Sequence, residues 1–293
     1  MKKLLLVIAA VAICGAAPCT AAPLKVAAAL PDLGSIAAYI GGDKVEVFSI
    51  GRNNANPHAV EVLPSYMIKV SRAAVYLKVG LALDQWSDAI IDGARNGRLI
   101  VADCSAGITP LQKPAGKVDA SMGDVHPDGN PHYWLDPANG TVIAGNVLAA
   151  LKKADPANAE YYEMNCARFR AELARRAAGW KAALAGLAGQ SVISYHSSWI
   201  YFTTAFGLTI AGSVEPLPGI PPTAKHLAEL VDVIKRDRIS LLLQEAYFPD
   251  GAPQFLARQT GVKVFKLTPS CGSVKADSYL AHFDEIVSKL LGR

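Results

Sequence analysis

Three histidines occupy short turns whose composition suits metal binding. His58 and His132 each follow an Asn-Pro dipeptide, and His196 follows an apolar, strand-like run. Proline restricts the backbone of such turns, so the imidazoles should be held in fixed positions. Neutral imidazole nitrogens are good ligands for divalent transition metals. We predict that these three side chains converge on one metal ion.

The residues after His132 predict how its turn is held. Two aromatic residues, Tyr133 and Trp134, lead into Asp136-Pro137. An aspartate at the N-cap accepts hydrogen bonds from free helical N–H groups, and proline is favoured at the first helical position. His132 should therefore lie just before the N-terminus of a helix, on a short and well-fixed loop.

Glu245 adds a carboxylate to the three imidazoles. It follows a predicted strand at residues 239–243 and should face the cleft in which the histidines meet. Three imidazoles and one carboxylate favour zinc over manganese or iron, because manganese prefers more oxygen ligands. Trp199 and Tyr247 flank the proposed ligands and, with the aromatic pair that follows His132, could exclude water from them.

The order of apolar and amphipathic segments predicts the fold class. Short apolar runs alternate with helix-like segments, which indicates parallel sheets of about four strands with helices on both faces. Residues 157–187 contain no proline and are rich in strong helix formers, so they predict one helix about 45 Å long. We therefore predict an α/β fold of two lobes joined by a long rigid helix, with the metal site in the interlobe cleft. The predicted division is a signal peptide at 1–21, an N-terminal α/β lobe at 22–150, a linking helix at 151–188 and a C-terminal α/β lobe at 189–293.

Residues 105–131 interrupt this pattern, because they contain several prolines and glycines. Loops of this length are uncommon in compact domains and are usually functional or mobile. This loop carries His126 among the acidic residues Asp119, Asp124 and Asp128, and it runs into the second Asn-Pro turn. His126 is therefore a further candidate for metal contact, either as a capture residue or as a weak ligand.

Residues 1–21 have the features of a secretion signal. Two lysines are followed by an apolar segment at residues 4–17, and small residues near its end allow cleavage after Ala21. The apolar segment is too short for a transmembrane anchor. We expect export to the periplasm, with no membrane insertion of the mature chain.

The cysteines and the overall charge exclude several other classes of protein. Cys14 and Cys19 are not preceded by the small residues that a lipidation site requires, so a lipoprotein is not expected. Two of Cys104, Cys166 and Cys271 could pair after export, but we favour free buried thiols. The chain is 51% hydrophobic and its net charge is only +4, so no nucleic-acid partner is expected. We expect a monomer.

The chain resembles the metal-binding substrate-binding proteins of ABC importers for zinc and manganese. The resemblance runs along almost the whole chain after residue 21 and implies two α/β lobes, a long rigid helix and a metal between the lobes. It implies that His58, His132 and His196 are ligands, and that the chain is not an enzyme but captures a divalent metal, zinc before manganese or iron, for delivery to a membrane permease. The matching motifs are Gly41-Gly42-Asp43-Lys44-Val45, Asn56-Pro57-His58-Ala59-Val60-Glu61, Pro64-Ser65, Pro131-His132-Tyr133-Trp134-Leu135-Asp136-Pro137, Tyr195-His196 and Glu245-Ala246-Tyr247.

One position departs from the family pattern. Many members carry an aspartate at the end of the last strand, where residues 267–272 of this chain contain no carboxylate. We expect Glu245 to act as the fourth ligand in its place. Asp277, His126 and a water molecule are the alternatives.

Two other functions fit parts of the sequence. A three-histidine zinc site with an open position could serve a metal-dependent hydrolase, although no HExxH or comparable helix motif is present. A metal-free binding or adhesion protein of the same fold is the second alternative. Of the remaining polar residues, His226 and His282 are expected in helices with their side chains in solvent, and Asp32 is expected to cap a helix.

Overall fold

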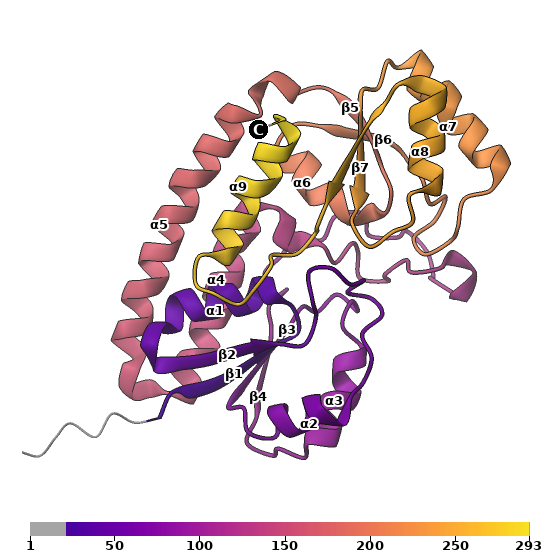
Figure 1. Cartoon of the computed structure of the whole chain (residues 1–293). Helices are drawn as coiled ribbons and strands as arrows, with labels where there is room; N and C mark the ends of the chain where they lie inside the picture. The colour runs from indigo at the N-terminus through magenta and orange to yellow at the C-terminus, as the bar shows by residue number, and fades with distance from the viewer. Residues whose placement is uncertain (1–21, 293) are drawn as a thin grey trace, which may run out of the picture.

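Two parallel β-sheets of four strands each form the centres of two lobes (Figure 1), which confirms the predicted fold class. The computed structural model describes residues 22–292, so the predicted signal peptide lies outside the described residues. The strand order is β2-β1-β3-β4 in the first sheet and β6-β5-β7-β8 in the second, so the two sheets share one topology. The strands are β1 (Leu24–Ala28), β2 (Val45–Ser49), β3 (Val75–Lys78), β4 (Ile100–Asp103), β5 (Ser191–Ser194), β6 (Thr209–Ser213), β7 (Leu241–Glu245) and β8 (Lys263–Leu267).

Helices connect the strands and cover the sheets. All hydrogen-bonded strand pairs are parallel, so each connection must cross from the end of one strand to the start of another. The predicted cap at Asp136 is confirmed, since its side chain accepts a hydrogen bond from the N–H group of Ala138. Thr223 caps another helix in the same way and accepts a hydrogen bond from the N–H group of His226. The helices are α1 (Pro31–Gly41), α2 (Pro64–Val70), α3 (Trp86–Ala94), α4 (Pro137–Ala154), α5 (Ala159–Ala183), α6 (Ile200–Ala205), α7 (Ala224–Arg236), α8 (Gly251–Thr260) and α9 (Ser278–Leu290).

Helix α5 runs along one side of the molecule from the first lobe to the second (Figure 1). It is shorter than the helix predicted at residues 157–187, because 3₁₀ turns occupy Pro156–Asn158 and Ala185–Leu187. Helix α9, the last element of the chain, packs against both α5 and α1. The two lobes are therefore connected by α5 and also by packing of the C-terminal helix on elements of the first lobe.

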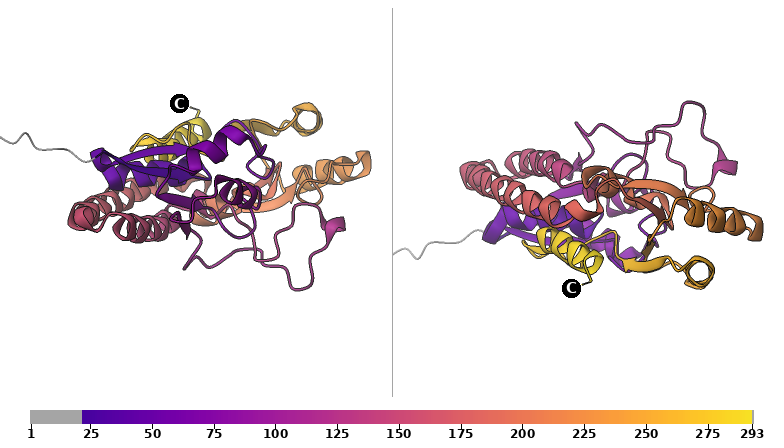
Figure 2. Two further views of the ribbon diagram at one scale, coloured as in Figure 1. Left: turned by 90° about the horizontal axis from the view of Figure 1, so that it is seen from below. Right: turned by 90° about the horizontal axis from the view of Figure 1, so that it is seen from above.

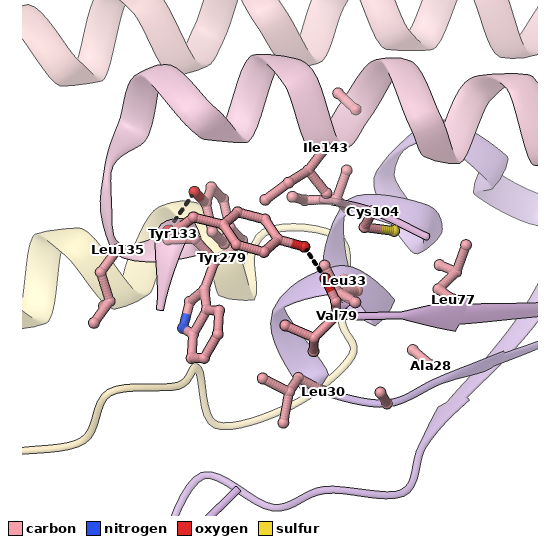
Figure 3. Packing of buried hydrophobic residues seen from close by; sticks show 14 of the residues in the cluster. Ala28, Leu30, Leu33, Leu77, Val79, Cys104, Tyr133, Leu135, Ile143 and Tyr279 are labelled. Carbon is pink, nitrogen blue, oxygen red and sulfur yellow. Dashed lines mark hydrogen bonds between the residues drawn. The ribbon is translucent and has the colours of Figure 1, made fainter. Parts of the chain in front are cut away.

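The residues that follow His132 belong to a buried cluster that includes Tyr133 and Tyr279 (Figure 3). The Tyr133 hydroxyl donates a hydrogen bond of 2.7 Å to the carbonyl oxygen of Val79, at the end of β3. The Tyr279 hydroxyl of α9 donates one of 2.8 Å to the carbonyl oxygen of Trp134. Because these rings are buried and their hydroxyls are paired, a shift of the His132 turn would disrupt both hydrogen bonds.

Two of the expected roles are wrong. Leu30, not Asp32, is the N-cap of α1, and Asp32 is completely buried in the first helical turn. Its carboxylate accepts hydrogen bonds from the Ser270 hydroxyl and from the Cys271 N–H group at 3.1 Å. His282 is only 4% exposed, and its Nε2 hydrogen-bonds to the loop after β8 while its Nδ1 lies 3.9 Å from Asp32. Asp32 and His282 therefore both lie where α1 meets the loop after β8, although this loop is more than 200 residues from α1 in sequence.

The long loop at residues 105–131 extends beside the second lobe (Figure 2). Apart from the 3₁₀ turn at Ala120–Met122 it has no regular structure. It is anchored at its tip, because the N–H group of Asp124 donates a hydrogen bond of 2.7 Å to the carbonyl oxygen of Pro218 in the second lobe. The loop therefore reaches from one lobe to the other.

Three further expectations can be compared with the structure. Cys104, Cys166 and Cys271 are free and buried, as favoured from the sequence. His226 is half-buried, and its Nε2 lies 2.9 Å from the carbonyl oxygen of Ser213, so the expectation of a solvated side chain is wrong. Within residues 22–292, no helix has the length and apolar character needed to cross a membrane.

Candidate metal centre

The structure brings His58, His132 and His196 together between the lobes. One ring nitrogen from each lies within 4.8 Å of the corresponding atoms of the other two. His132 and His196 are buried, and His58 is half-buried. His58 follows β2 and His132 precedes α4 in the first lobe, whereas His196 follows β5 in the second. The site thus forms where the carboxyl ends of strands from both sheets meet.

Within the triad, the Nε2 atoms of His58 and His132 lie only 3.2 Å apart. Two lone pairs cannot face each other at this distance, so a proton or a cation must lie between them. Two nitrogen ligands of a tetrahedral zinc ion, each at about 2.0 to 2.1 Å from the metal, are separated by about 3.3 Å. The observed separation is thus suitable for two ligands of one metal ion.

Asn130 determines which nitrogen of His132 faces the site. Its side-chain amide donates hydrogen bonds to Gln112 Oε1 and to the carbonyl oxygen of Ser197, which orients its Oδ1 toward the imidazole. Oδ1 then accepts from the His132 backbone N–H and lies 3.0 Å from Nδ1. His132 Nδ1 must therefore carry a hydrogen, and its Nε2 has a free lone pair.

His126 lies against the outer side of His58. The two rings are stacked with centroids 5.1 Å apart, and His126 Nε2 lies 3.3 Å from His58 Nδ1. Nδ1 is the nitrogen of His58 that does not face His132, so His126 does not belong to the compact triad. His126 can instead accept a hydrogen bond from His58 Nδ1–H, which leaves His58 Nε2 for a metal.

Glu215 was not recognised from the sequence, although it contacts the third histidine. Its Oε2 lies 2.7 Å from His196 Nδ1, and both side chains are buried. His196 Nε2 is buried and has no hydrogen-bond partner. The only sequence signal was the position of Glu215 directly after a predicted strand, the same signal that singled out Glu245.

Glu245, the last residue of β7, is fully buried near His196 but outside the compact triad. Neither carboxylate oxygen makes a hydrogen bond of normal geometry. The hydroxyls of Ser198 and Tyr247 are buried in the same region. Burial raises the pKa of Tyr247, and the charge of Glu245 raises it further. Asp277, an alternative fourth ligand, is exposed at the residue before α9.

The two lobes shift the imidazole pKa values in opposite directions. Burial, followed by the charges of neighbouring histidines, lowers the pKa of His58 and His132 well below the usual value. Burial also opposes protonation of His196, but its hydrogen bond to Glu215 and the charges of Glu245 and Glu215 raise its pKa overall. Burial raises the pKa of Glu245, and His196 partly offsets this effect. His58 and His132 are consequently unprotonated at neutral pH, so that each has a lone pair available for a metal.

This arrangement of two similar α/β lobes, a connecting helix and an interlobe histidine triad defines a two-lobed binding protein for a divalent metal. The sequence matches the family described as "ZnuA: Zinc-uptake complex component A periplasmic" over residues 26–291. The chain belongs to this family of metal-binding substrate-binding proteins of ABC importers.

Known relatives and solved structures agree with this assignment. YfeA of Yersinia pestis, an iron-binding protein, is 24% identical over 250 residues, which cover 83% of this chain and 76% of YfeA. PsaA of Streptococcus pneumoniae, a manganese ABC transporter substrate-binding lipoprotein, is 24% identical over 253 residues, covering 83% of this chain and 78% of PsaA. A crystal structure of ZnuA matches with a TM-score of 0.79 and 27% identity, over 92% of this chain and 98% of ZnuA. These relatives are substrate-binding proteins and not enzymes, so the hydrolase alternative is set aside.

Proposed function

We propose that this protein captures zinc outside the cytoplasmic membrane and delivers it to the permease of an ABC importer. The names of its relatives include iron and manganese as well as zinc, so the choice of metal depends on the ligands of this chain. Three imidazoles give a nitrogen-rich set that suits zinc, whereas manganese is favoured by sites with more oxygen.

One observation carries this proposal: the three ring nitrogens within 4.8 Å of one another, including two Nε2 atoms only 3.2 Å apart. We propose His58, His132 and His196 as the ligands. We propose Glu245 as the fourth, because its carboxylate is fully buried, makes no hydrogen bond of normal geometry and interacts electrostatically with His196. A bound dication would compensate a buried charge that is otherwise unfavourable.

We also propose where the protein acts, how its chain is divided and what its partner is. Residues 1–21 would direct export to the periplasm and be removed. The mature protein would consist of an N-terminal lobe at 22–150, a linking helix at 151–188 and a C-terminal lobe at 189–293. It would act as a monomer, with the membrane permease as its partner. The word periplasmic in the family description supports this location.

Transport measurements separate zinc from the other metals. Cells that lack this protein should accumulate less zinc when zinc is scarce, and the wild-type chain should restore zinc uptake. A His58→Ala, His132→Ala double variant, matched for expression, should not restore it. Normal zinc uptake together with a loss of manganese or iron uptake in the deletion strain would contradict the assignment of zinc.

A further inference from the structure

Glu215 makes two contacts with a single oxygen atom. This residue lies in the loop after β6 and is only 7% exposed. Its Oε2 accepts hydrogen bonds from His196 Nδ1–H at 2.7 Å and from the backbone N–H of Gly219 at 3.0 Å. A carboxylate oxygen can accept both, and the buried setting makes these charge-assisted bonds short and directional.

The first contact determines how His196 can bind a metal. A neutral imidazole has one N–H group and one lone pair, so a hydrogen on Nδ1 leaves the lone pair on Nε2. His196 Nε2 is buried without a hydrogen-bond partner, and the His196 ring lies 5.2 Å from the His58 ring and 5.5 Å from the His132 ring. Glu215 thus leaves the lone pair of His196 on Nε2, the nitrogen available for a metal shared with His58 and His132.

The second contact, with Gly219, lies beside one of the contacts between the two lobes. Gly219 follows Pro218, whose carbonyl oxygen accepts the hydrogen bond from the Asp124 N–H group of the first lobe. We call the contact between residues 123–124 and 218–219 the interlobe clasp. A cavity of about 360 Å³ lies beside it, lined by residues of both lobes that include Asp124, His126 and Glu215.

The backbone of the clasp is built for close approach. Gly123 and Gly219 have φ angles of +65° and +77°, which glycine adopts without strain. A Cβ atom on Gly123 would collide with the carbonyl oxygen of Pro218, and one on Gly219 would lie 2.6 Å from Asp124 Oδ2. A side chain at position 123 would therefore prevent this contact, and one at position 219 would strain the backbone and displace the Asp124 carboxylate.

We propose that Glu215 is a positioning residue that couples the metal ligand His196 to the interlobe clasp. This inference rests on the proposed role of His196 as a ligand. Because one oxygen holds both the imidazole and Gly219, the ring cannot change its position without disturbing the backbone beside Pro218. Metal bound at His196 therefore stabilises the clasp, and opening of the clasp loosens the third ligand.

Two variants of Glu215 separate its roles. Glu215→Ala removes both hydrogen bonds and should weaken zinc binding by about 10- to 100-fold, the range expected for loss of a partner that orients a ligand. Glu215→Gln retains an oxygen acceptor and should lose less than Glu215→Ala. Glu229→Ala on the exposed face of α7 is the matched control, because Glu229 forms only a 3.9 Å surface ion pair with Lys225.

Two further measurements report on His196 and the clasp directly, and both use the metal-free protein. At a pH high enough to keep His196 neutral, long-range ¹⁵N–¹H NMR spectra should show its Nδ1–H tautomer in the wild-type protein and in Glu215→Gln, but a mixture of tautomers in Glu215→Ala. Hydrogen exchange of the Asp124 amide should be at least about tenfold faster in Glu215→Ala, because the loop that holds Pro218 is released. Zinc should slow this exchange in the wild-type protein.

The outcomes distinguish this inference from the proposed function. If the wild-type protein binds zinc, but Glu215→Ala binds it within about twofold of wild type and keeps the His196 tautomer, the positioning role is wrong and the function stands. Unchanged exchange at Asp124 in Glu215→Ala would overturn the coupling to the clasp. If the wild-type protein binds no zinc, the proposed function fails, and the NMR and exchange measurements still decide the role of Glu215.

Discussion

The two lobes contribute different chemistry to the same site. The first lobe supplies His58 and His132, whose outer nitrogens face neutral groups and whose pKa values are lowered chiefly by burial. The second lobe supplies His196 with two buried carboxylates, Glu215 and Glu245, which raise the pKa of this imidazole against the effect of burial. One half of the site is neutral and the other is acidic.

This difference indicates how the site can hold a dication and still release it. The neutral half presents lone pairs that protons do not block near neutral pH. The acidic half would provide the negative charge to compensate a bound metal. Because the two buried carboxylates lie on one lobe only, separation of the lobes would take His58 and His132 away from them and should weaken metal binding.

Loss of a ligand from the neutral half should have the largest effect. His132→Ala should weaken zinc binding by at least about 100-fold, which corresponds to about 2.7 kcal/mol. Isothermal titration with a competing chelator measures the dissociation constant. His226→Ala, which removes an imidazole outside the triad, should stay close to wild type. An unchanged Kd for His132→Ala would exclude this residue as a ligand.

A change in the acidic half should have a smaller effect on zinc affinity and an opposite effect on the stability of the metal-free protein. Glu245→Gln should weaken zinc binding by about tenfold, because it removes a proposed ligand charge. The folded-state pKa of Glu245 is raised, so its ionised form destabilises the metal-free fold once the pH exceeds the unfolded pKa. The variant should therefore raise the free energy of unfolding by about 1 kcal/mol at neutral pH, but not at acidic pH where the wild-type carboxyl is protonated.

Chemical denaturation of the metal-free protein at both pH values provides the stability measurement. Retained zinc affinity in Glu245→Gln would mean that Asp277 or water completes the coordination. A loss of stability at neutral pH would show that the carboxylate is compensated without metal.

The two halves should also respond differently to acid. Metal binding requires neutral imidazoles, so affinity should fall as the pH drops. The raised pKa of His196 means that protons compete there first, whereas the lowered pKa values of His58 and His132 delay competition to more acidic pH. Affinity should decline by about tenfold per pH unit once the pH falls below the pKa of His196, the dependence for one proton, and more steeply where His58 and His132 also take up protons.

Calorimetry in buffers of different ionisation enthalpy counts the released protons. About one proton per zinc near neutral pH would agree with the difference between the lobes, and three would contradict it. Equal affinity at about pH 5 and pH 7.5 would exclude an imidazole site altogether.

The smallest effect on zinc binding should come from Asp32, which lies outside the site. Asp32→Ala leaves the Ser270 hydroxyl and the Cys271 N–H group without their buried acceptor. It should lower the free energy of unfolding by about 2 kcal/mol, while zinc affinity stays within about twofold of wild type. Thermal unfolding and zinc titration of the same sample compare the two. A large loss of affinity would mean that this junction also controls the site.

The fold could be predicted largely from local sequence patterns. The alternation of apolar runs with amphipathic segments determines the parallel sheets, and the Asp136-Pro137 pair marks the start of α4. The two Asn-Pro-His turns indicated histidines in fixed positions, because proline and the side chains of Asn56 and Asn130 restrain the backbone locally.

Roles that depend on distant partners could not be predicted in this way. Asp32 binds Cys271, a residue 239 positions away, and nothing near Asp32 in sequence distinguishes this contact from a helix cap. Glu215 follows β6 and Glu245 ends β7, the two strands that pair with β5, yet only Glu215 contacts His196 by a hydrogen bond. Which side chains lie next to His196 is determined by the order of the strands in the folded sheet, which the local sequence does not contain.

Anomalous scattering from crystals of the zinc-loaded protein tests the central claim most directly. We predict a single strong peak at the zinc absorption edge, about 2.0 to 2.2 Å from Nε2 of His58, His132 and His196. A peak that does not contact His196, or one centred on His126 and Asp124 instead, would contradict a metal site shared by the two lobes.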